Sequence, residues 1–372
     1  MVNPSGARGS DHLADGFWRN RRVFLTGHTG FKGAWLAAWL RHLGASVTGY
    51  SLEPPTSPSL FEALDMGRDV AGDIADVRDG AALAAAMARA EPEVVLHLAA
   101  EAVVRTAYAE PVRTFDVNVM GTVHVLEGAR RLPSVRVVVI CTSDKSYEND
   151  EAGRPFVESD RLGGRDPYSA SKACAELVTT AYRASFFSGG AAPSVVSVRA
   201  GNVFGGGDWG RDRLLPDAAR AFSRCEPVVV RNPSAQRPWQ YVLDPLAGYL
   251  AAARAAVEGG HAFSTAWNFG PHHSHAWTVS HLVEAFAAEW GGGASVQVMP
   301  EEEAPHEAHL LQLDSSRART ELGWAPRVGV AEALRRSAGL YKAFYAGDRA
   351  AIRRQMAEEF DAYPTAPAVG PA

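Results

Sequence analysis

Two side chains four residues apart could carry out acid–base chemistry, Tyr168 and Lys172 in the segment YSASK. On a helix, residues at this spacing share one face. An ammonium group beside a phenol favours the phenolate and lowers its pKa toward a useful range. The phenolate can then take the proton of a hydroxyl group while a hydride leaves the carbon that carries it. The same spacing also occurs by chance on exposed helices, so the neighbouring segments must show whether this pair is catalytic.

Ser143 is a second candidate, because it follows a run of apolar residues that predicts a buried strand over 135–141. Doubly wound parallel sheets place their ligands at the carboxyl ends of the strands. In short-chain dehydrogenases, a hydroxyl group at this strand end hydrogen-bonds to the substrate oxygen. A strand-end hydroxyl followed by a tyrosine–lysine pair therefore indicates oxidation of an alcohol.

A glycine-rich loop, GHTGFKG, follows a strand predicted over 22–26 and opens a helix predicted over 31–43. Glycines there permit a tight turn and close approach of a pyrophosphate, and the helix start offers free N–H groups. The GxxGxxG spacing is typical of extended short-chain dehydrogenases, and it predicts a dinucleotide site. The predicted cofactor-binding residues of the loop are Gly27, Thr29, Gly30, Phe31, Lys32 and Gly33.

Further cofactor contacts are predicted near other strand ends. Asp73, followed by Ile74, could reach the adenine amine, although an aspartate there could equally be a turn residue. The strand predicted over 93–98 ends in the small-residue segment Leu98, Ala99 and Ala100, which is predicted to lie beside the cofactor. The segment YSL at 50–52 carries neither the acid that holds a ribose hydroxyl nor an arginine for a 2′-phosphate. This rule therefore leaves the choice between NAD and NADP open.

The elements that must position these residues alternate between strands and helices. Strands are predicted over 22–26, 46–50, 93–98, 135–141 and 194–199, and helices over 31–43, 76–90, 111–131 and 166–187. This alternation predicts an α/β fold with a Rossmann-like, doubly wound parallel sheet. After residue 201, glycines and prolines interrupt the rhythm, which indicates a smaller C-terminal substrate-binding lobe.

The expected organisation has four parts: a disordered lead-in over 1–17, an NAD-binding Rossmann domain over 18–200, a mainly substrate-binding lobe over 201–350, and a C-terminal tail over 351–372. Some segments of the lobe are expected to return to the first domain. The lead-in has no apolar stretch and is not expected to be a signal peptide. Trp35 and Trp39, four residues apart, are predicted to be core residues.

Composition narrows the class of protein. The chain of 372 residues has a formal net charge of -5 and no long basic run, which argues against nucleic-acid and membrane binding. No apolar run approaches the length needed to cross a bilayer. Three widely spaced cysteines support neither a disulfide framework nor a metal site, and they favour a reduced, cytoplasmic compartment.

Several segments together resemble the CDP-glucose 4,6-dehydratases, a family of extended short-chain dehydrogenases. The likeness runs from about residue 18 to about residue 345. An Asp-Lys pair follows the strand-end hydroxyl, whereas dTDP-glucose dehydratases carry Asp-Glu there. The matching segments are 27–43, 49–52, 54–56, 142–147, 163–168, 201–209, 213–216, 237–240, 305–308 and 322–324.

The resemblance implies a three-step reaction with tightly bound NAD on a nucleotide-diphosphate sugar, with CDP-glucose favoured. Tyr168, assisted by Lys172 and Ser143, would oxidise the hexose at C4. Water would then leave across C5 and C6, and hydride would return to C6. Asp144 is the implied general acid for the departing 6-hydroxyl. Lys145 could be the C5 base if its pKa were depressed, orient Asp144, or stabilise the enolate.

The resemblance also implies substrate contacts in the second lobe. Arg213 and Arg237 are expected to clamp the pyrophosphate, because a planar guanidinium suits phosphate oxygens. Asn202 is expected to contact the β-phosphate or the sugar. Glu101 stands where this family usually has glutamine, and it would add a carboxylate near the cofactor and the sugar. Ser146 stands where cysteine is usual.

Three alternatives remain from the sequence: a dehydratase acting on another nucleotide sugar, a 4-epimerase, and a catalytically silent protein that senses NAD(H). An epimerase needs no acid for elimination, so Asp144 argues against it. A silent sensor usually loses the tyrosine or lysine, and this chain keeps both. By analogy, we also expect a homo-oligomer, a dimer or tetramer, built through the long helices over 103–131 and 167–187.

Overall fold

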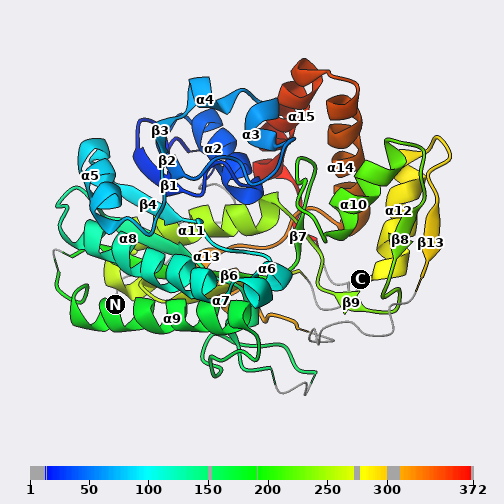
Figure 1. The fold of residues 1–372 in the computed structure, drawn as a ribbon. Coiled ribbons are helices and arrows are strands. Elements are labelled where there is room, and N and C mark those ends of the chain that lie inside the picture. The colour runs from blue at the N-terminus through cyan, green and yellow to red at the C-terminus, as the bar shows by residue number, and fades with distance from the viewer. Residues whose placement is uncertain are drawn as a thin grey trace.

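A seven-stranded sheet, parallel throughout, forms the centre of the computed structural model, which describes residues 13, 15–149, 153–190, 192–271, 277–299 and 311–369 (Figure 1). The strand order is β11-β6-β5-β4-β1-β2-β3, so the chain starts in the middle and winds outward in both directions. The predicted Rossmann-like, doubly wound sheet is confirmed. The strands are β1 (Arg22–Thr26), β2 (Ser46–Ser51), β3 (Ala71–Ile74), β4 (Val94–His97), β5 (Val137–Cys141), β6 (Ser194–Ala200) and β11 (Ala266–Phe269).

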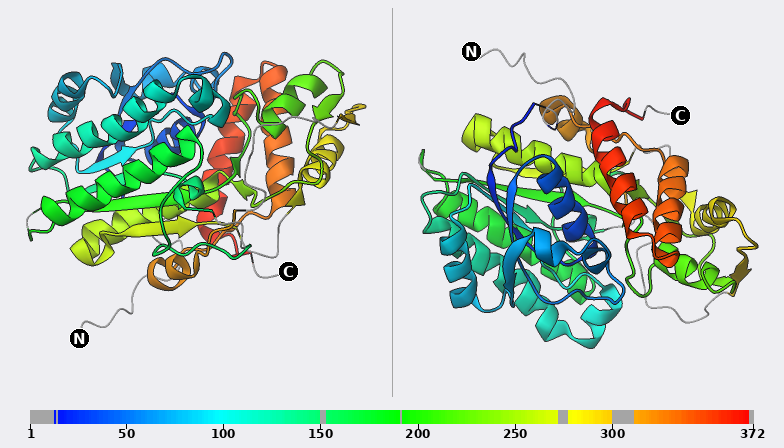
Figure 2. Two further views of the ribbon diagram at one scale, coloured as in Figure 1. Left: turned by 60° about the horizontal axis from the view of Figure 1, so that its bottom comes forward. Right: turned by 90° about the horizontal axis from the view of Figure 1, so that it is seen from above.

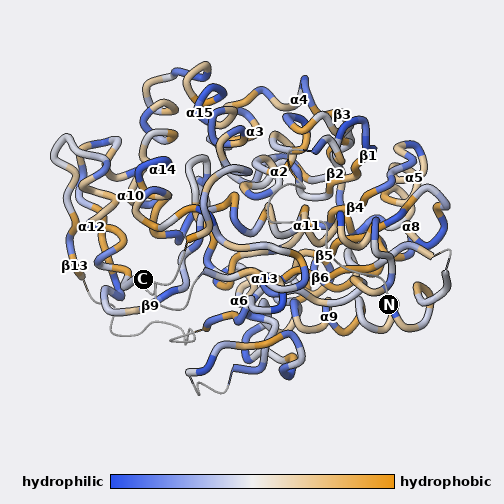
Figure 3. Tube along the Cα trace, turned by 180° about the vertical axis from the view of Figure 1, so that it is seen from behind, coloured by the Kyte–Doolittle hydropathy of each residue, from blue (hydrophilic) through white to orange (hydrophobic). Residues whose placement is uncertain are grey.

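Alternation along β5 explains how one strand holds two layers of helices together. Val137 and Val139 point into one apolar cluster and Val138 and Ile140 into the other, and all four are buried. Side chains of α5 (Gly80–Ala90), α8 (Gly121–Arg130) and α9 (Pro167–Ser185) fill one cluster. Those of α2 (Phe31–His42) and α11 (Leu243–Gly259) contribute to the other. Apolar residues accordingly run through the centre of the molecule, around β5 and β6 (Figure 3).

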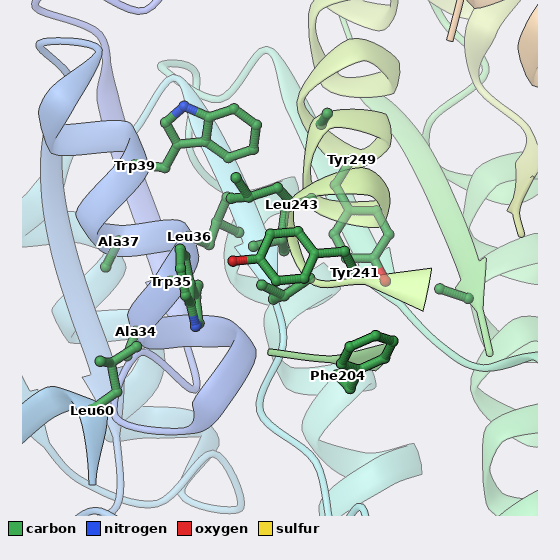
Figure 4. Packing of buried hydrophobic residues seen from close by; sticks show 14 of the residues in the cluster. Ala34, Trp35, Leu36, Ala37, Trp39, Leu60, Phe204, Tyr241, Leu243 and Tyr249 are labelled. Carbon is green, nitrogen blue, oxygen red and sulfur yellow. The ribbon is translucent and has the colours of Figure 1, made fainter. Parts of the chain in front are cut away.

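The helix that follows the glycine loop is anchored by aromatic packing. Trp35 and Trp39 are fully buried, as predicted, and Trp35 meets the ring of Tyr241 edge to face at 6.2 Å (Figure 4). The indole Nε1 of Trp35 donates a hydrogen bond to the Gly206 carbonyl at 2.9 Å. Because these contacts anchor the middle of α2, they hold in place the helix that follows the glycine loop.

The remaining elements form an outer lobe and connections. α10 (Leu214–Phe222), α12 (Val279–Trp290) and α14 (Val330–Tyr345) pack together beside a strand pair, β8 (Val228–Val230) with β13 (Val296–Val298). Figure 2 shows α15 (Arg349–Ala362) beside α14, between this lobe and the sheet. α11 and β11 return to the sheet, as expected for some segments after residue 201. The short elements are α3 (Leu60–Ala63), α4 (Met66–Asp69), α6 (Val104–Ala109), α7 (Pro111–Phe115), β7 (Val203–Phe204), β9 (Gln236–Arg237), β10 (Gln240–Tyr241), β12 (Trp277–Thr278) and α13 (Ser316–Leu322).

Some element boundaries differ from the sequence-based expectation. The helix predicted over 76–90 begins at Gly80, because the Asp79 side chain caps it by accepting from the Ala82 N–H. The helix predicted over 111–131 is interrupted by a π-helical turn, η1 (Asp116–Met120), between α7 and α8. The edge strand β3 was not predicted as a strand, since its four residues include a glycine and an aspartate.

The prediction of a C-terminal tail from residue 351 is wrong for residues 351–362. Residues up to 362 belong to α15, which buries Ile352, Met356 and Phe360 in the core. Most of the predicted lead-in (1–12 and 14), the segment at 305–308 and the last three residues lie outside the described residues. Within the described ranges, no helix is both long and apolar enough to span a membrane.

An aspartate holds the end of the chain against α11. Asp244 is buried, and its Oδ1 accepts hydrogen bonds from the Tyr363 hydroxyl at 2.7 Å and the Arg327 N–H at 2.8 Å. Burial raises the pKa of Asp244 from 3.8 to about 7, although these hydrogen bonds act to lower it. The folded protein therefore binds a proton here more tightly than the unfolded chain does.

The substitution Asp244→Asn should flatten the dependence of stability on pH. A raised folded pKa contributes stability that is fully present below pH 3.8 and is lost as pH rises through about 7. In wild type this group contributes a fall in unfolding free energy of up to about 1.4 kcal/mol per pH unit within that window. Urea unfolding across the window measures the slope, with D69N at an exposed carboxylate as control. An unchanged slope in D244N would contradict the assignment.

Candidate active site

The end of β5 turns sharply into a 3-10 turn, η2 (Asp144–Ser146), which together with Ser143 we call the catalytic turn, residues 143–146. The Ser143 hydroxyl accepts a hydrogen bond from the Lys145 N–H at 3.2 Å and donates one to Asp144 Oδ1 at 2.9 Å. Ser143, Asp144 and Ser146 are buried. The turn thus presents a hydroxyl and a carboxyl side by side at the carboxyl end of the central strand, where this fold binds ligands.

The start of α9 brings the predicted tyrosine and lysine to the same place. Asp166 caps the helix by accepting from the Ser169 N–H at 2.9 Å, and Pro167 occupies the first turn. One turn apart on α9, Tyr168 and Lys172 are both buried. The predicted helix and the predicted pairing on one face are confirmed.

Contacts between α9 and the catalytic turn complete the group. The Tyr168 hydroxyl lies close to the Ser143 side chain, which acts to lower the pKa of the tyrosine. Lys172 Nζ donates to the Cys141 carbonyl at 3.3 Å, at the last residue of β5. Ser143, Asp144, Tyr168 and Lys172, predicted from separate segments, therefore lie together.

The ionisation of this group differs from the expected one. Burial raises the pKa of Tyr168 to about 12, with the Ser143 hydrogen bond opposing it. Burial likewise lowers the pKa of Lys172 to about 8. The expectation that Lys172 depresses the tyrosine pKa is wrong, because the lysine contacts a carbonyl and desolvation of the phenolate dominates.

The environment of Asp144 favours its protonated form, as a general acid requires. Burial raises its pKa, while the charges of Lys145 and Lys32 and the Ser143 hydrogen bond oppose the rise. A buried carboxyl that keeps its proton more readily than usual can donate it to a leaving group. A Cβ on Gly201 would lie 2.7 Å from Asp144 Oδ2, so only a glycine leaves room for the carboxyl there.

The glycine loop has the geometry of a pyrophosphate cradle. Gly27 has a φ of 76°, and a Cβ there would lie 2.6 Å from the Ala99 backbone nitrogen. A Cβ on Gly33 would lie 1.9 Å from the Gly27 carbonyl oxygen, so α2 packs tightly on the loop. A Cβ on Gly30, by contrast, would meet only the Gly27 oxygen at 3.4 Å. No side chain caps α2, so its first N–H groups remain available to bind an anionic group such as a pyrophosphate.

The other predicted cofactor residues lie along the same edge of the sheet. Leu98, Ala99 and Ala100 are half-buried after a fully buried β4. Asp73, the penultimate residue of β3, is partly exposed and pairs with Arg89 at 2.5 Å, and Ile74 at the end of the strand is exposed. Of the other loop residues predicted to bind the cofactor, Thr29 donates its hydroxyl to the Leu52 carbonyl at 2.9 Å, and Phe31 and Lys32 are half-buried.

The second lobe brings some of the predicted substrate residues to this centre. Arg213 pairs with Asp208 at 2.7 Å, and its positive charge acts to lower the pKa of Tyr168. Asn202 is half-buried next to Gly201, and its carbonyl accepts from the Gln240 N–H at 3.0 Å. Arg237 is half-buried in β9, next to Pro238, which also lies against Gly201.

Glu101 lies beside the start of α9, and the π-helical turn explains how. Asn118 in η1 accepts from the Glu101 N–H at 2.9 Å and donates to its carbonyl at 3.0 Å and to Ser171 Oγ at 2.8 Å. Burial raises the pKa of Glu101, although Arg113 lies 3.6 Å away. Asn118 was not among the predicted site residues, because nothing in a helical pattern marks a π-helical turn.

A buried ion pair behind the site was also missed. Glu176 accepts two hydrogen bonds from Arg199, both at 2.8 Å, and both side chains are almost fully buried. Glu176 also accepts from the Thr142 hydroxyl at 2.6 Å, and Arg199 donates to the Tyr147 hydroxyl at 2.6 Å. Burial raises the pKa of Glu176, but Arg199 outweighs it and holds that pKa below its ordinary value. Spacing places Glu176 on the face of Lys172, but the sequence does not reveal its partner.

The described part of the chain has no evident metal-binding site. Among the residues that the structure describes, no group of three or more His, Cys, Asp or Glu side chains could hold a metal ion. The three cysteines are free thiols, and the only one in the candidate site is Cys141.

Comparisons with known proteins agree with this geometry. The family model for GDP-mannose 4,6 dehydratase matches residues 24–337. The chain is 47% identical over 336 residues to a CDP-glucose 4,6-dehydratase of Salmonella typhimurium, covering 89% of this chain and 93% of that protein. It is 28% identical to a UDP-glucose 4-epimerase of Mycolicibacterium smegmatis, over 86% of this chain and 98% of the relative.

Solved structures share the fold. A UDP-glucose 4-epimerase of Thermotoga maritima with UDP-glucose superposes with a TM-score of 0.74 at 20% identity, covering 87% of this chain and 99% of the other. A dTDP-glucose 4,6-dehydratase of Bacillus anthracis in complex with NAD gives a TM-score of 0.70 at 18% identity, covering 87% and 96%. The resemblance and the fold inferred from the motifs are both confirmed.

Proposed function

The chain belongs to the GDP-mannose 4,6 dehydratase family, and within it we propose that the protein is an NAD-dependent CDP-glucose 4,6-dehydratase. The reaction converts CDP-D-glucose to CDP-4-keto-6-deoxy-D-glucose. One observation carries the proposal: a buried carboxyl group of raised pKa, Asp144, lies next to the Ser143–Tyr168 pair. An alcohol-oxidising centre needs only the pair, whereas loss of water also needs an acid.

The side chains at the β5 end have distinct roles in the first step. Bound NAD+ would accept the hydride that leaves C4 of the sugar and would later return it to C6. Tyr168 takes the proton of the 4-hydroxyl, and Ser143 hydrogen-bonds to the same oxygen. Lys172 provides a positive charge close to both, which stabilises the phenolate once the ligands exclude water.

Elimination uses the catalytic turn. Asp144 donates its proton to the departing 6-hydroxyl, for which its raised pKa suits it. The carboxylate of Glu101, whose pKa is raised by burial, takes the C5 proton. Lys145 is half-buried next to Asp144, and its positive charge stabilises the enolate that this proton transfer forms. Ser143 links the two steps, because its hydroxyl group contacts both Asp144 and Tyr168.

Binding of the two ligands is assigned to opposite sides of this centre. The loop residues Gly27 to Gly33, with Asp73, Ile74, Leu98, Ala99 and Ala100, hold the cofactor. Arg213 and Arg237 bind the substrate pyrophosphate, and Asn202 binds the sugar or the adjoining phosphate. Glu101, fixed through its backbone by Asn118, limits which sugar is accepted.

A cytoplasmic homodimer is part of the proposal. Large apolar side chains remain exposed on one helical surface, which comprises Tyr108, Val112, Phe115, Met120 and Leu177 from α6, α7, η1 and α9. Val112 is 83% exposed, which is unfavourable for a valine unless a partner covers it. A second copy of the chain is the proposed partner, through the helices over 103–131 and 167–187.

The substitution Val112→Glu should convert the dimer to a monomer. A charge at the centre of an apolar interface must be desolvated without a partner on association. Size-exclusion chromatography with light scattering measures the mass, and Val157→Glu at another exposed apolar site serves as the control. A wild-type protein that already runs as a monomer would refute the assigned interface.

The substitution Asp144→Asn should separate oxidation from elimination. The isosteric amide cannot protonate the leaving hydroxyl, so formation of dehydrated product should fall by roughly 10² to 10⁴-fold. Oxidation at C4 should persist, and absorbance of reduced nicotinamide should appear on mixing with CDP-glucose. Tyr168→Phe is the matched control, since it should abolish both signals. Dehydration at the wild-type rate in D144N would exclude Asp144 as the acid.

The proposed function is tested directly by incubating the purified protein with CDP-glucose and, separately, with dTDP-, UDP- and GDP-sugars, followed by mass spectrometry. Loss of one water from CDP-glucose without added reductant is the expected result. Loss of water from another sugar would keep the mechanism and change the substrate. No change of mass with any sugar would refute the dehydratase and favour an epimerase or an NAD(H) sensor.

A further inference from the structure

Lys32 places a third lysine side chain at the catalytic centre, beside Lys145 and Lys172, and it comes from the glycine loop. Its Nζ lies 3.8 Å from Cys141 Sγ, at the end of β5, and 5.9 Å from the centre of the Tyr249 ring. The Cys141 thiol in turn lies 3.5 Å from the Tyr249 hydroxyl. The long side chain therefore reaches from the cofactor loop across to the strand that carries the catalytic turn.

Its charge acts on the groups that do the chemistry. Lys172 Nζ contacts the carbonyl of the same residue, Cys141, whose thiol faces Lys32. The ammonium group of Lys32 opposes the protonation of both Lys172 and Asp144. Within the described ranges, no carboxylate forms a salt bridge with Lys32, so its charge is not locally neutralised.

The position of this lysine is unfavourable for the helix that carries it. Lys32 is the second residue of α2, where the helix dipole presents its positive end, and the first turn contains no acidic residue. A cation there costs stability in the absence of ligands. Residues that oppose local stability are commonly retained for function.

We propose that Lys32 sets the redox balance of the bound cofactor, by favouring the neutral reduced nicotinamide over the cationic oxidised ring. This inference rests on the proposed function, in which the cofactor must hold a hydride while water is eliminated. The oxidised ring carries one positive charge, and that charge disappears when the ring accepts a hydride. A fixed cation beside the reacting groups therefore repels one form and not the other.

The test compares the dissociation constants of NAD+ and NADH for the full-length, cofactor-free protein without any sugar, by calorimetry and by NADH fluorescence. In Lys32→Met, the preference for NADH over NAD+ should fall by about tenfold, the size of a unit-charge interaction across a partly buried site. Lys32→Arg should retain most of the preference, since it keeps the charge. Lys342→Met, at a surface lysine on α14, controls for net charge.

An equal loss of affinity for both forms in K32M would overturn the proposal, because Lys32 would then serve the phosphates or the fold. An unchanged ratio would overturn it as well. If K32M fails to fold, as judged by thermal unfolding, Lys32→Gln replaces it with the same expected outcome. The result is separate from the sugar assay: a wild type that dehydrates CDP-glucose while K32M keeps its ratio refutes only the role of Lys32.

Discussion

The buried ion pair between Glu176 on α9 and Arg199 on β6 is the interaction on which the site depends. It holds Thr142 through the carboxylate and Tyr147 through the guanidinium, so both ends of the catalytic turn attach to one pair. Two charges in the interior are tolerated because each is satisfied by several hydrogen bonds. Removing one partner of such a pair typically costs about 3 to 5 kcal/mol, since the other remains buried and uncompensated. The same pair links the helix that carries Tyr168 and Lys172 to the sheet that carries Ser143.

Burial has a second consequence for the chemistry. Desolvation is the largest influence on the pKa of Tyr168, Lys172 and Asp144, and in each case it favours the neutral form. In such a buried site, each added or removed charge has a larger effect on the neighbouring groups than it would have in water. Electrostatic preorganisation of this kind needs rigid support, which the ion pair and the packed tryptophans of α2 provide.

Much of the fold and the central part of the site could be predicted, because they depend on local patterns. Strands buried on both faces give continuous apolar runs, as in β5, and glycines at a strand-to-helix turn mark the cradle. Tyr168 and Lys172 are one helical turn apart, so their proximity follows from spacing alone. The π-helical turn around Asn118 had no comparable local signal, because its conformation depends on partners distant in the sequence. The helix α15 did have one, an aspartate cap followed by Ile352, Met356 and Phe360 at four-residue spacing, which the prediction of a tail overlooked.

By itself, the sequence determined the parallel class of the sheet, the glycine loop, the Tyr168–Lys172 pair on α9 and the resemblance to one family. Each of these depends on residues that lie close together in the chain. Only the tertiary structure decided which charges meet. It paired Glu176 with Arg199, buried Asp244 against Tyr363, and brought Lys32 to Cys141, contacts that span 23, 119 and 109 residues. The physical reason is that a pKa depends on burial and on the nearest charges in space, and neither can be read from neighbours in sequence.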